Sequence, residues 1–487
     1  MSARCVMVLG TTSGAGKSWL TTALCRHYAR QGLKVAPFKA QNMSNNARVV
    51  DGGEIGSAQY FQALAAQAEP EVRMNPLLLK PEADTRSQVV LMGQVNEALS
   101  SMPWRGRSLH VWPQIAAALD ALMDENDVVV IEGAGSPAEI NLHASDIVNM
   151  RVALHARAHC LLVSDIDRGG AFAHLYGTWA LLPAEERALI HGFVLNKFRG
   201  DASLLAPAPR MLQDLTGVPT VATLPMWWQH GLPEEDGVFD DKTRAAGVVS
   251  RTVAVIAYPH ISNLDEFQPL KNVPGVRLVW ARSPADCAGA DWLVLPGSKA
   301  TAADLAWLRA QGLDRAIATH AAQGGAVLGV CGGLQMLGEA LIDTHGIEPM
   351  DLGNAPGLGL LPLVTQFDPQ KTVRHTHTAF GALHGAWAAL SGVAAAGYEI
   401  HHGQTAQHPA MAAGGDVARE VLPGGLGWQN AQGNVLGVYL HGLFEDPRVL
   451  HALFGATAPT LETVFNGLAD FITTHFEPGV LDQLIAP

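Results

Sequence analysis

Cys331 is the residue of this chain best placed to act as a nucleophile. It stands in the segment AVLGVCGGLQMLG (326–338), where an apolar run ends in a Gly-x-Cys-x-Gly turn and continues as an amphipathic helical pattern. Such a turn lifts the central side chain clear of a sheet, and the helix N-terminus behind it favours the thiolate. The segment therefore predicts a nucleophile elbow that carries sulfur instead of a serine oxygen.

A thiol nucleophile needs a base, and His441 in GVYLHGLFED (437–446) follows directly after another predicted strand. A histidine at that position takes the thiol proton and carries it to a leaving amine. The N–H groups of Gly332, after the nucleophile, and of Gly297, in LPGSK (295–299), are suited to form an oxyanion hole. An unpaired cysteine is usually a small core residue, but the elbow and the strand-end histidine together favour a catalytic role.

A second set of residues is suited to bind a nucleotide. GTTSGAGKS (10–18) lies between the first predicted strand and the first predicted helix, as a P-loop requires, and is one residue longer than G-x4-G-K-[ST]. Backbone N–H groups of such a loop surround the phosphates, the lysine neutralises the β and γ oxygens, and the serine reaches Mg²⁺. VLNKFRGD (194–201) offers further groups for the base, although a simple Asn-Lys turn explains it equally well. The predicted ATP-binding residues are Gly10, Thr11, Gly14, Gly16, Lys17, Ser18, Asn196 and Lys197.

Acidic and amide side chains at other strand ends extend this site. Glu132 ends the buried run VVVIE (128–132), and Asp165 follows the run LLVS (161–164). Ligands of open sheets bind at the carboxyl edge of the strands, so Ser18, Glu132 and Asp165 are the predicted Mg²⁺ ligands. The polar segment FKAQNMSNN (38–46) suits a substrate that bears carboxylates and amides. The predicted substrate residues are Lys39, Gln41, Asn42, Ser44, Asn46 and Asp167.

Further histidines lie in pairs in RHTHTAF (374–380) and YEIHHGQT (398–405). No cysteine or carboxylate spacing completes a zinc site around them, so we expect them to be structural or to face a substrate. The expected cofactors are ATP and Mg²⁺, with no tightly bound prosthetic group.

Strands and helices in alternation are needed to hold these residues. Short β-branched runs alternate with helical patterns from the start of the chain to TVATLP (220–225), and a second alternating set runs from TVAVIAY (252–258) to NVLGVYLHG (434–442). This spacing predicts right-handed βαβ units and an α/β fold of two doubly wound domains. We predict a nucleotide-binding domain at 1–228, a linker at 229–250, a thiol-bearing domain at 251–446 and a helical tail at 447–487.

The composition is that of a well-buried chain with more than one domain. Of its 487 residues 48% are hydrophobic and 16% are charged. No apolar run reaches the roughly 20 residues of a membrane span, and a formal net charge of −13 argues against a nucleic-acid partner. Five scattered cysteines and an N-terminus unlike a signal peptide predict a cytoplasmic location. An oligomer is compatible with this sequence.

Nine segments, taken in order, resemble the cobyric acid synthase family over nearly the whole chain. They are GTTSGAGKS, KAQNMSNN, IEGAGSPAEINL, DIDRGG, NKFRGD, PGSK, GVCGGLQMLG, GYEIHHGQT and YLHG. The resemblance implies a dethiobiotin synthetase-like P-loop domain followed by a class I glutamine amidotransferase-like domain. It also implies three small-molecule substrates, which are a corrinoid, L-glutamine and ATP.

The resemblance further implies a reaction in cobalamin biosynthesis. Cys331 would attack the side-chain amide of glutamine, and His441 would protonate the ammonia that leaves. MgATP would phosphorylate a carboxylate of adenosylcobyrinic acid a,c-diamide, and ammonia would displace the phosphate. The family repeats this step at the b, d, e and g positions to give adenosylcobyric acid.

Two positions depart from the related patterns. Many class I amidotransferases have Glu two residues after the histidine, but Leu443 stands there, so the group that orients His441 is open and Glu445 is only a weak candidate. Gly14 stands where the family often has an acidic residue, and we do not expect this to abolish nucleotide binding.

Three alternatives remain open from the sequence. The sister enzyme, cobyrinic acid a,c-diamide synthase, shares the two-domain plan, although KAQNMSNN and DIDRGG resemble cobyric acid synthase more closely. A P-loop switch ATPase with a degenerate second domain would hydrolyse ATP without regard to glutamine, and intact Cys331 and His441 oppose it. A corrinoid carrier without chemistry would bind the ring and release no glutamate.

Overall fold

The apolar runs of the first half of the chain form a parallel sheet. The computed structural model describes residues 3–83, 86–228, 230–233, 248–348, 353–456 and 458–486. Within them the first sheet has the order β12-β11-β10-β1-β9-β2, and each of these pairings is parallel. Its strands are β1 (Arg4–Gly10), β2 (Val35–Phe38), β9 (Val128–Glu132), β10 (His159–Asp165), β11 (Ile190–Phe198) and β12 (Thr220–Pro225).

Helices cover both faces of this sheet, because successive strand residues point to opposite sides. Met7 and Leu9 of β1 belong to one apolar core, whereas Val6 and Val8 belong to another. The first core is completed by α4 (Trp104–Glu125), α5 (Met150–Ala156), α6 (Ala171–Leu181) and α9 (Pro207–Thr216), and the second by α1 (Lys17–Arg30). The doubly wound fold predicted for this half is confirmed.

The second half builds another α/β sheet, in the order β15-β13-β16-β18-β25-β24-β23. The first five strands pair in parallel, and they are β15 (Val276–Ala281), β13 (Arg251–Ile256), β16 (Trp292–Leu295), β18 (Ala326–Val330) and β25 (Val435–Val438). Helices α11 (Thr301–Ala310), α12 (Leu313–Ala322) and α13 (Gly332–Leu337) follow β16 and β18. The α/β class is confirmed, but β24 (Gly427–Gln429) and β23 (Arg419–Leu422) add an antiparallel edge that the alternation did not predict.

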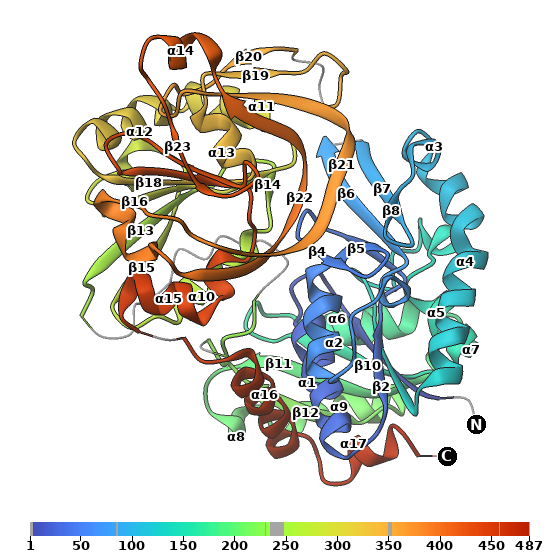
Figure 1. Ribbon diagram of the computed structural model, residues 1–487. Coiled ribbons are helices and arrows are strands. Elements are labelled where there is room, and N and C mark those ends of the chain that lie inside the picture. The colour runs from blue at the N-terminus through green and yellow to red at the C-terminus, as the bar shows by residue number, and fades with distance from the viewer. Residues whose placement is uncertain are drawn as a thin grey trace.

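A long antiparallel hairpin lies between the two α/β sheets. It consists of β21 (Leu363–Ala379) and β22 (Ala394–Gln407), which carry the paired histidines. Figure 1 places it over β4 (Ala47–Val50) and β5 (Gly53–Gly56), a small hairpin of the first domain that precedes α2 (Ser57–Ala65). The first domain also has a side sheet of β3 (Gln41–Met43), β6 (Leu77–Ala83), β7 (Arg86–Leu91) and β8 (Gln94–Val95).

The end of the chain returns to the first domain. After α15 (Pro447–Phe454), helix α16 (Leu461–His475) lies alongside α1, and α17 (Val480–Gln483) follows it (Figure 1). Phe465, Leu468 and Ile472 of α16 share an apolar core with α1. An ion pair of 2.6 Å joins Arg26 of α1 to Glu462 of α16.

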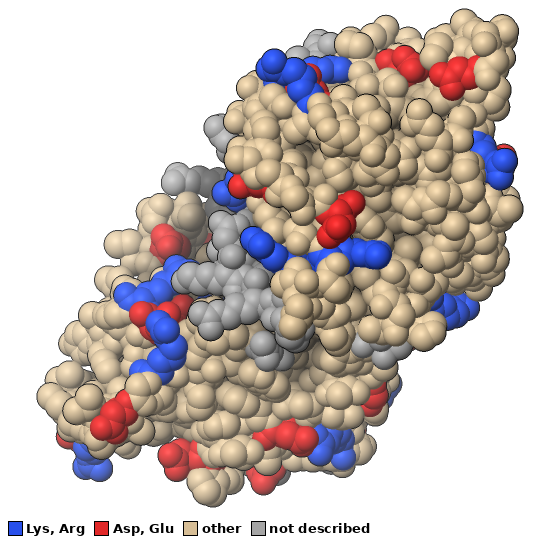
Figure 2. Space-filling model, turned by 90° about the vertical axis from the view of Figure 1, so that its left-hand side faces the viewer, with Lys and Arg blue, Asp and Glu red and all other residues tan. Residues whose placement is uncertain are grey.

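Several sequence expectations concern segments and surfaces outside these sheets. Most of the predicted linker, residues 229 and 234–247, lies outside the described residues. Among the described helices, none combines the length and apolarity that crossing a bilayer needs. On the face shown in Figure 2, the described charged side chains are scattered and neither sign gathers into a patch.

Candidate functional site

Strand β18 delivers Cys331 to the start of α13 through a strained turn. The backbone of Cys331 has φ 51° and ψ −107°, a conformation that L residues rarely adopt. The helix begins directly against β16, since a Cβ added to Gly333 would lie 1.9 Å from the carbonyl oxygen of Leu295. Glycine in this turn permits the close packing of strand, nucleophile and helix that an elbow requires.

His441 is buried next to Cys331 and is oriented by Glu266. Nδ1 of His441 lies 2.9 Å from Oε1 of Glu266, and Oε2 of the same carboxylate accepts the N–H of Gly442 at 2.8 Å. Burial alone would lower the pKa of His441, but the charge of Glu266 and the interaction with Cys331 outweigh it and raise that pKa to about 10. With Nδ1 turned to a carboxylate, Nε2 is the nitrogen left to exchange a proton with the sulfur.

Glu266 completes a Cys–His–Glu arrangement that sequence reasoning missed. It lies in the short turn η3 (Leu264–Phe267), 175 residues before the histidine, so no spacing rule connects the two. The weak candidate Glu445 does not orient the imidazole: its Oε1 lies 2.6 Å from Nη2 of Arg48. The only sequence signal for Glu266 is its place in a loop after the strand at 251–256, at the carboxyl edge where sites of such sheets form.

The structure brings Gly297 and Gly332 to the thiol. A Cβ added to Gly297 would lie 2.9 Å from Cε1 of His441, and one added to Gly332 would lie 2.8 Å from the backbone N of Ser298. Gly297 belongs to β17 (Gly297–Ser298), which pairs with β14 (Ile261–Ser262) just before η3. The segment that carries the predicted oxyanion donor is therefore fastened to the segment that carries Glu266.

A polar pocket opens beside Cys331 and His441. It is lined by residues of the second domain together with Asn45 and Lys80 of the first domain. Burial raises the pKa of Glu348, which also lines the pocket, to about 7, and burial lowers the pKa of Lys80 to about 7. A pocket with an acid and an amine near a thiol suits a small amino-acid substrate.

Strand β1 and helix α1 hold the phosphate loop. Gly14 and Gly16 have φ of 70° and 101°, which lets successive N–H groups turn toward one centre. Nζ of Lys17 donates to the carbonyl oxygens of Thr12 at 3.1 Å and Gly135 at 3.3 Å. These contacts hold the ammonium group over the loop, where phosphate oxygens are expected.

Glu132 is the centre of a buried polar cluster next to this loop. Its Oε1 accepts hydrogen bonds from Oγ of Ser18 and Nζ of Lys39, both at 2.8 Å, and its Oε2 accepts one from Gln62 at 2.5 Å. Burial opposes ionisation, but Lys39 and the hydrogen bonds outweigh it and lower the pKa of Glu132. A hydroxyl and an ionised carboxylate are hard oxygen donors of the kind Mg²⁺ prefers.

The described residues contain no group of three or more His, Cys, Asp and Glu side chains that could hold a metal ion. A Mg²⁺ ion near Ser18 and Glu132 would therefore take most of its remaining ligands from nucleotide phosphates and water, as Mg²⁺ in nucleotide sites usually does. The donor set fits Mg²⁺ that arrives with ATP and does not resemble an all-protein metal cage.

The other predicted nucleotide residues support the phosphate loop from β11. Asn196 donates to the carbonyl of Ala15 at 2.9 Å, and Nζ of Lys197 bridges the carbonyl of Gly14 at 2.9 Å and Oδ2 of Asp165 at 3.1 Å. Asp165, at the end of β10, therefore pairs with the ammonium group of Lys197 on β11, whereas Ser18 and Glu132 are hydrogen-bonded to each other beside β1 and β9.

The amide-rich segment 38–46 runs from the nucleotide site to the second domain. Lys39 lies at the Glu132 cluster, and Oδ1 of Asn46 accepts the N–H of Leu264, in η3, at 3.0 Å. None of the predicted substrate residues in this segment lines the large cavity between the domains; these described residues are Lys39, Gln41, Asn42, Ser44 and Asn46. The sixth predicted substrate residue, Asp167, pairs with Arg199. The segment joins the two sites physically.

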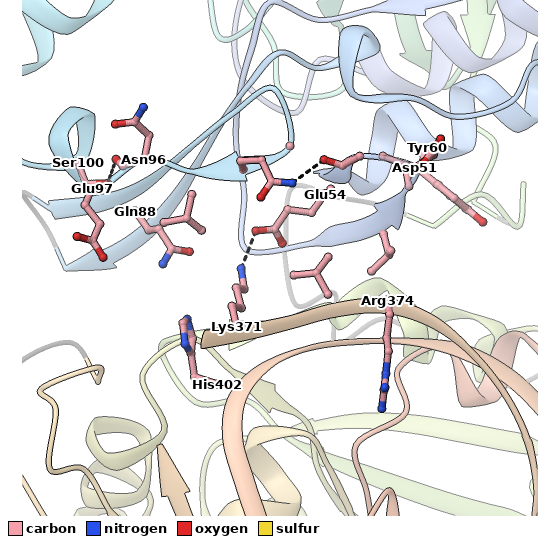
Figure 3. A pocket seen from close by; sticks show the side chains of 18 of the residues that line it. Asp51, Glu54, Tyr60, Gln88, Asn96, Glu97, Ser100, Lys371, Arg374 and His402 are labelled. Atoms are coloured by element: carbon pink, nitrogen blue, oxygen red, sulfur yellow. Dashed lines mark hydrogen bonds and ion pairs between the residues drawn. The ribbon is translucent and has the colours of Figure 1, made fainter. Parts of the chain in front are cut away.

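A cavity of about 1660 Å³ lies between the two domains and is lined by both. In Figure 3, Glu54 of β5 faces Lys371 and His402 of the long hairpin, and Nζ of Lys371 lies 2.6 Å from Oε1 of Glu54. Nζ of Lys80 lies 2.5 Å from Oε2 of the same carboxylate. Ile347, Lys371 and His402 also line the pocket beside Cys331, so the cavity and the pocket share a wall.

Burial and charge decide the protonation of this shared wall. Burial disfavours the ionised form of Glu54, but Lys371 and Lys80 outweigh it and lower the pKa of Glu54 to about 2. Burial lowers the pKa of His402 to about 4. At neutral pH the wall therefore carries an ionised carboxylate and an uncharged imidazole.

Of the paired histidines of the long hairpin, His375 and His377 are exposed, whereas His401 and His402 have defined partners. His401 stacks on Tyr439 with 4.0 Å between ring centroids, and its Nε2 lies 3.2 Å from Glu399. Nδ1 of His402 lies 3.0 Å from the carbonyl of Asp368. Both histidines line the pocket beside the thiol, which makes them part of its wall.

Known proteins resemble this chain over both halves. Residues 6–232 match the family described as the CobQ/CobB/MinD/ParA nucleotide binding domain, and residues 252–449 match the CobB/CobQ-like glutamine amidotransferase domain. The cobyric acid synthase of Acidovorax ebreus (strain TPSY) is 78% identical over 498 residues, which cover 99% of each chain. Those of Polaromonas naphthalenivorans (strain CJ2) and Variovorax paradoxus (strain S110) are also 78% identical, and each match covers 100% of both chains.

Proposed function

The chain belongs to the cobyric acid synthase family, and on that premise we propose that it amidates a corrinoid with nitrogen from glutamine and energy from ATP. The proposed substrate is adenosylcobyrinic acid a,c-diamide, and the proposed product is adenosylcobyric acid, formed by amidation at the b, d, e and g carboxylates. One observation carries the proposal: a single chain holds a phosphate loop with Glu132 beside it and a Cys–His–Glu site whose pocket shares a wall with a large cavity between the domains.

The second domain supplies ammonia in this proposal. Sγ of Cys331 attacks the side-chain amide carbon of glutamine, the C–N bond breaks, and His441 gives its proton to the leaving nitrogen. Glu266 supports this step, because it accepts from Nδ1 and stabilises the imidazolium that forms. Water then attacks the thioester, releases glutamate and returns the thiol.

The first domain activates the carboxylate. A carboxylate is a poor acyl donor, and transfer of the γ-phosphoryl group of ATP to its oxygen supplies a leaving group. Ammonia then attacks the carbonyl carbon, the C–O bond to phosphate breaks, and an amide and inorganic phosphate result. We assign Lys17 to the phosphates and Ser18 with Glu132 to Mg²⁺, which would neutralise phosphate charge during the transfer.

We place the corrinoid in the cavity between the domains. Its volume of about 1660 Å³ exceeds the ~300–1,000 Å³ of sites for drug-sized ligands, which suits a macrocycle with several side chains. Because the cavity shares a wall with the thiol pocket, we propose that ammonia crosses at this wall to reach the corrinoid. All five cysteines are free thiols, which supports a reducing, cytoplasmic location.

The deciding experiment is a reconstitution with purified protein. Adenosylcobyrinic acid a,c-diamide, MgATP and glutamine are combined, and product mass and glutamate release are followed together. Four successive carboxylate-to-amide conversions are expected. ATP hydrolysis with an untouched a,c-diamide would refute the proposed substrate. In that case the reaction is repeated with cobyrinic acid, and its amidation at two positions would identify the sister activity.

Two variants assign the halves of the reaction. Cys331→Ala is expected to abolish the use of glutamine and to retain amidation driven by free ammonia. Lys17→Ala is expected to stop amidation with either nitrogen source. Ammonia-dependent activity retained in Lys17→Ala would contradict the phosphate role of that lysine.

A further inference from the structure

Arg48 is a buried arginine of the first domain that reaches behind the thiol site of the second domain. It lies in β4, and its side chain is 2% exposed. Its Nη2 forms ion pairs with Asp265, which is 1% exposed, and with Glu445, where the distance from Nη2 to Oε1 is 2.6 Å. A buried guanidinium between two carboxylates of another domain is costly to desolvate, so its position calls for a role.

Both acidic partners of Arg48 are neighbours of the residues that hold the imidazole. Asp265 precedes Glu266, which accepts from His441, and Glu445 lies in the turn η6 (Leu443–Glu445) that follows His441. The guanidinium of Arg48 therefore links the segment that contains Glu266 to the segment that contains His441. A planar, forked cation is suited to this, because it can serve two carboxylates at once.

Arg48 also contacts Tyr398, whose ring lies against the face of the His441 imidazole. Tyr398 stacks on His441, with 5.4 Å between ring centroids and 19° between the ring planes, and its backbone pairs with that of His441. Cζ of Arg48 lies 5.1 Å from the centroid of the Tyr398 ring. The arginine is thus in contact with groups on three sides of the His–Glu pair and does not touch the pair itself.

On its own domain, Arg48 rests on the helix that contacts the nucleotide site. Its Cζ lies 5.0 Å from the ring centroid of Phe61, in α2. The next residue of α2, Gln62, donates to Glu132, which also accepts from Ser18 of the phosphate loop. A continuous series of contacts therefore runs from the phosphate loop through α2 and Arg48 to the thiol site.

We propose that Arg48 is a positioning residue through which the nucleotide-binding domain holds Glu266 and His441 in their working arrangement. This inference rests on the proposed function and names how one half of the reaction controls the other. Nucleotide and corrinoid, by ordering α2 and β4, set the rate at which the thiol site hydrolyses glutamine.

The test compares Arg48→Met and Arg48→Lys with the wild-type protein. Glutamate release is measured with and without MgATP and corrinoid, and amidation is measured with glutamine and with ammonium. For Arg48→Met we expect kcat of glutamate release to fall roughly ten- to a hundredfold, as small misplacements of reacting groups do. KM for glutamine and ammonium-driven amidation are expected to stay within about twofold, since neither depends on the position of the imidazole.

Arg48→Lys keeps the charge but loses the fork, so we expect it to recover part of kcat. The matched control is Arg26→Met, which removes another buried arginine of the same domain that pairs with Glu462 on α16. It is expected to leave the ratio of glutamine-driven to ammonium-driven amidation unchanged. If Arg48→Met does not fold, Arg48→Lys and Glu445→Gln decide the question by the same ratio.

Three results would overturn the inference. An equal loss with both nitrogen sources would mean that Arg48 only supports the fold, and unchanged glutamate release would mean that it positions nothing. A wild-type rate of glutamate release that ignores MgATP and corrinoid would remove the coupling. Failure of the proposed function is distinguishable, because then the wild-type protein amidates the corrinoid with neither glutamine nor ammonium.

Discussion

The carboxylate of Glu266 serves two donors at once, which explains why a buried acid is kept there. It accepts from Nδ1 of His441 and from the N–H of Gly442, and its side chain is 1% exposed. The bond to Nδ1 holds that edge of the imidazole on the carboxylate and leaves Nε2 for Cys331, while the bond from Gly442 holds the backbone next to the histidine. The orientation of the base is thus fixed before glutamine arrives.

Replacing this acid by its amide tests that role. Glu266→Gln keeps the shape but leaves one acceptor oxygen for two donors, so we expect glutamate release to fall by roughly a hundredfold or more. Ammonium-driven amidation is expected to be unchanged, because it does not use the thiol. The measurement is glutamate release at saturating glutamine.

The matched control for this change is Glu462→Gln, an acid that pairs with Arg26 on the surface of the first domain. We expect full glutamate release from that variant. A Glu266→Gln protein that releases glutamate at the wild-type rate would rule out an orienting role for Glu266.

The protonation of His441 also makes stability depend on pH. Glu266 and Cys331 outweigh burial and raise the pKa of His441 from 6.5 to about 10 in the folded protein. A raised pKa of a base stabilises the fold fully below the unfolded value, and this contribution is lost as pH rises from about 6.5 to about 10. The free energy of unfolding lost in His441→Gln is therefore expected to be largest below pH 6.5.

Urea unfolding of the wild type and His441→Gln at pH 6, 8 and 9.5 measures this difference. Titrating groups that do not contact His441 are the same in both proteins and cancel to first order. We expect the difference to shrink steadily toward high pH. A difference that is constant, or that grows with pH, would contradict a charged imidazole in the resting site.

Residues in local motifs and at strand ends could be predicted from the sequence, whereas Glu266, which meets His441 only through the tertiary fold, could not. The turn around Cys331 and the loop at 10–18 are both local, and the strand ends bring Gly297, Gly332 and His441 near the thiol. Glu266 meets His441 only because β13 and β25 end at the same sheet edge. Glu445 looked closer in sequence, yet Arg48 occupies its carboxylate.

At the scale of elements, α16 completes the first domain from the far end of the chain. Leu468 is fully buried in the core that α16 shares with α1, and Arg26 and Arg30 of α1 pair with Glu462 and Asp470 of α16. Helix α1 begins at Lys17, so the support of α16 extends to the helix that carries the phosphate loop. We therefore expect a change in α16 to affect nucleotide binding.

Leu468→Ala tests this support. Removing a fully buried leucine side chain usually costs ~2–5 kcal/mol, through lost burial and the cavity left behind. We expect a loss of that size in urea unfolding followed by circular dichroism, with weaker nucleotide binding.

The control is Leu204→Ala, a leucine that is 82% exposed. It is expected to change the free energy of unfolding by less than about 0.5 kcal/mol. Equal effects of the two substitutions would mean that α16 contributes no specific packing.

Among the elements, the parallel strands were the easiest to predict and the hairpins the hardest. Buried parallel strands have continuous apolar runs, and all six strands of the first sheet coincide with such runs. The long strands β21 and β22 are half exposed and rich in Thr, His and Gln, so their sequence resembles loops. These two strands are held in an extended conformation by pairing with each other and by contact with β4.

At the scale of the whole molecule, the long hairpin contributes to the wall between the thiol pocket and the large cavity. Ile347, Lys371 and His402 stand between the thiol pocket and the large cavity. Ammonia is small, and His402 in this wall is uncharged at neutral pH, so that imidazole does not protonate it. Nitrogen released from glutamine is thus expected to reach the corrinoid without mixing with the solvent.

Isotope labelling tests this transfer. Amidation is run with glutamine labelled with ¹⁵N at the amide, together with unlabelled ammonium at equal concentration, and the product mass is measured. We expect most of the new amide nitrogen to carry the label. A label diluted in proportion to the ammonium in solution would show that ammonia leaves the protein before it reacts.

The return of α16 to the first domain has a consequence for how the protein is made. The ribosome finishes the sheet of the first domain at Pro225, but α16 begins only at Leu461. Translation adds ~5–20 residues per second, so the apolar surface of α1 remains without α16 for roughly 10–50 seconds. During that interval the nascent chain presents a surface to which chaperones bind, and the domain synthesised first is the domain completed last.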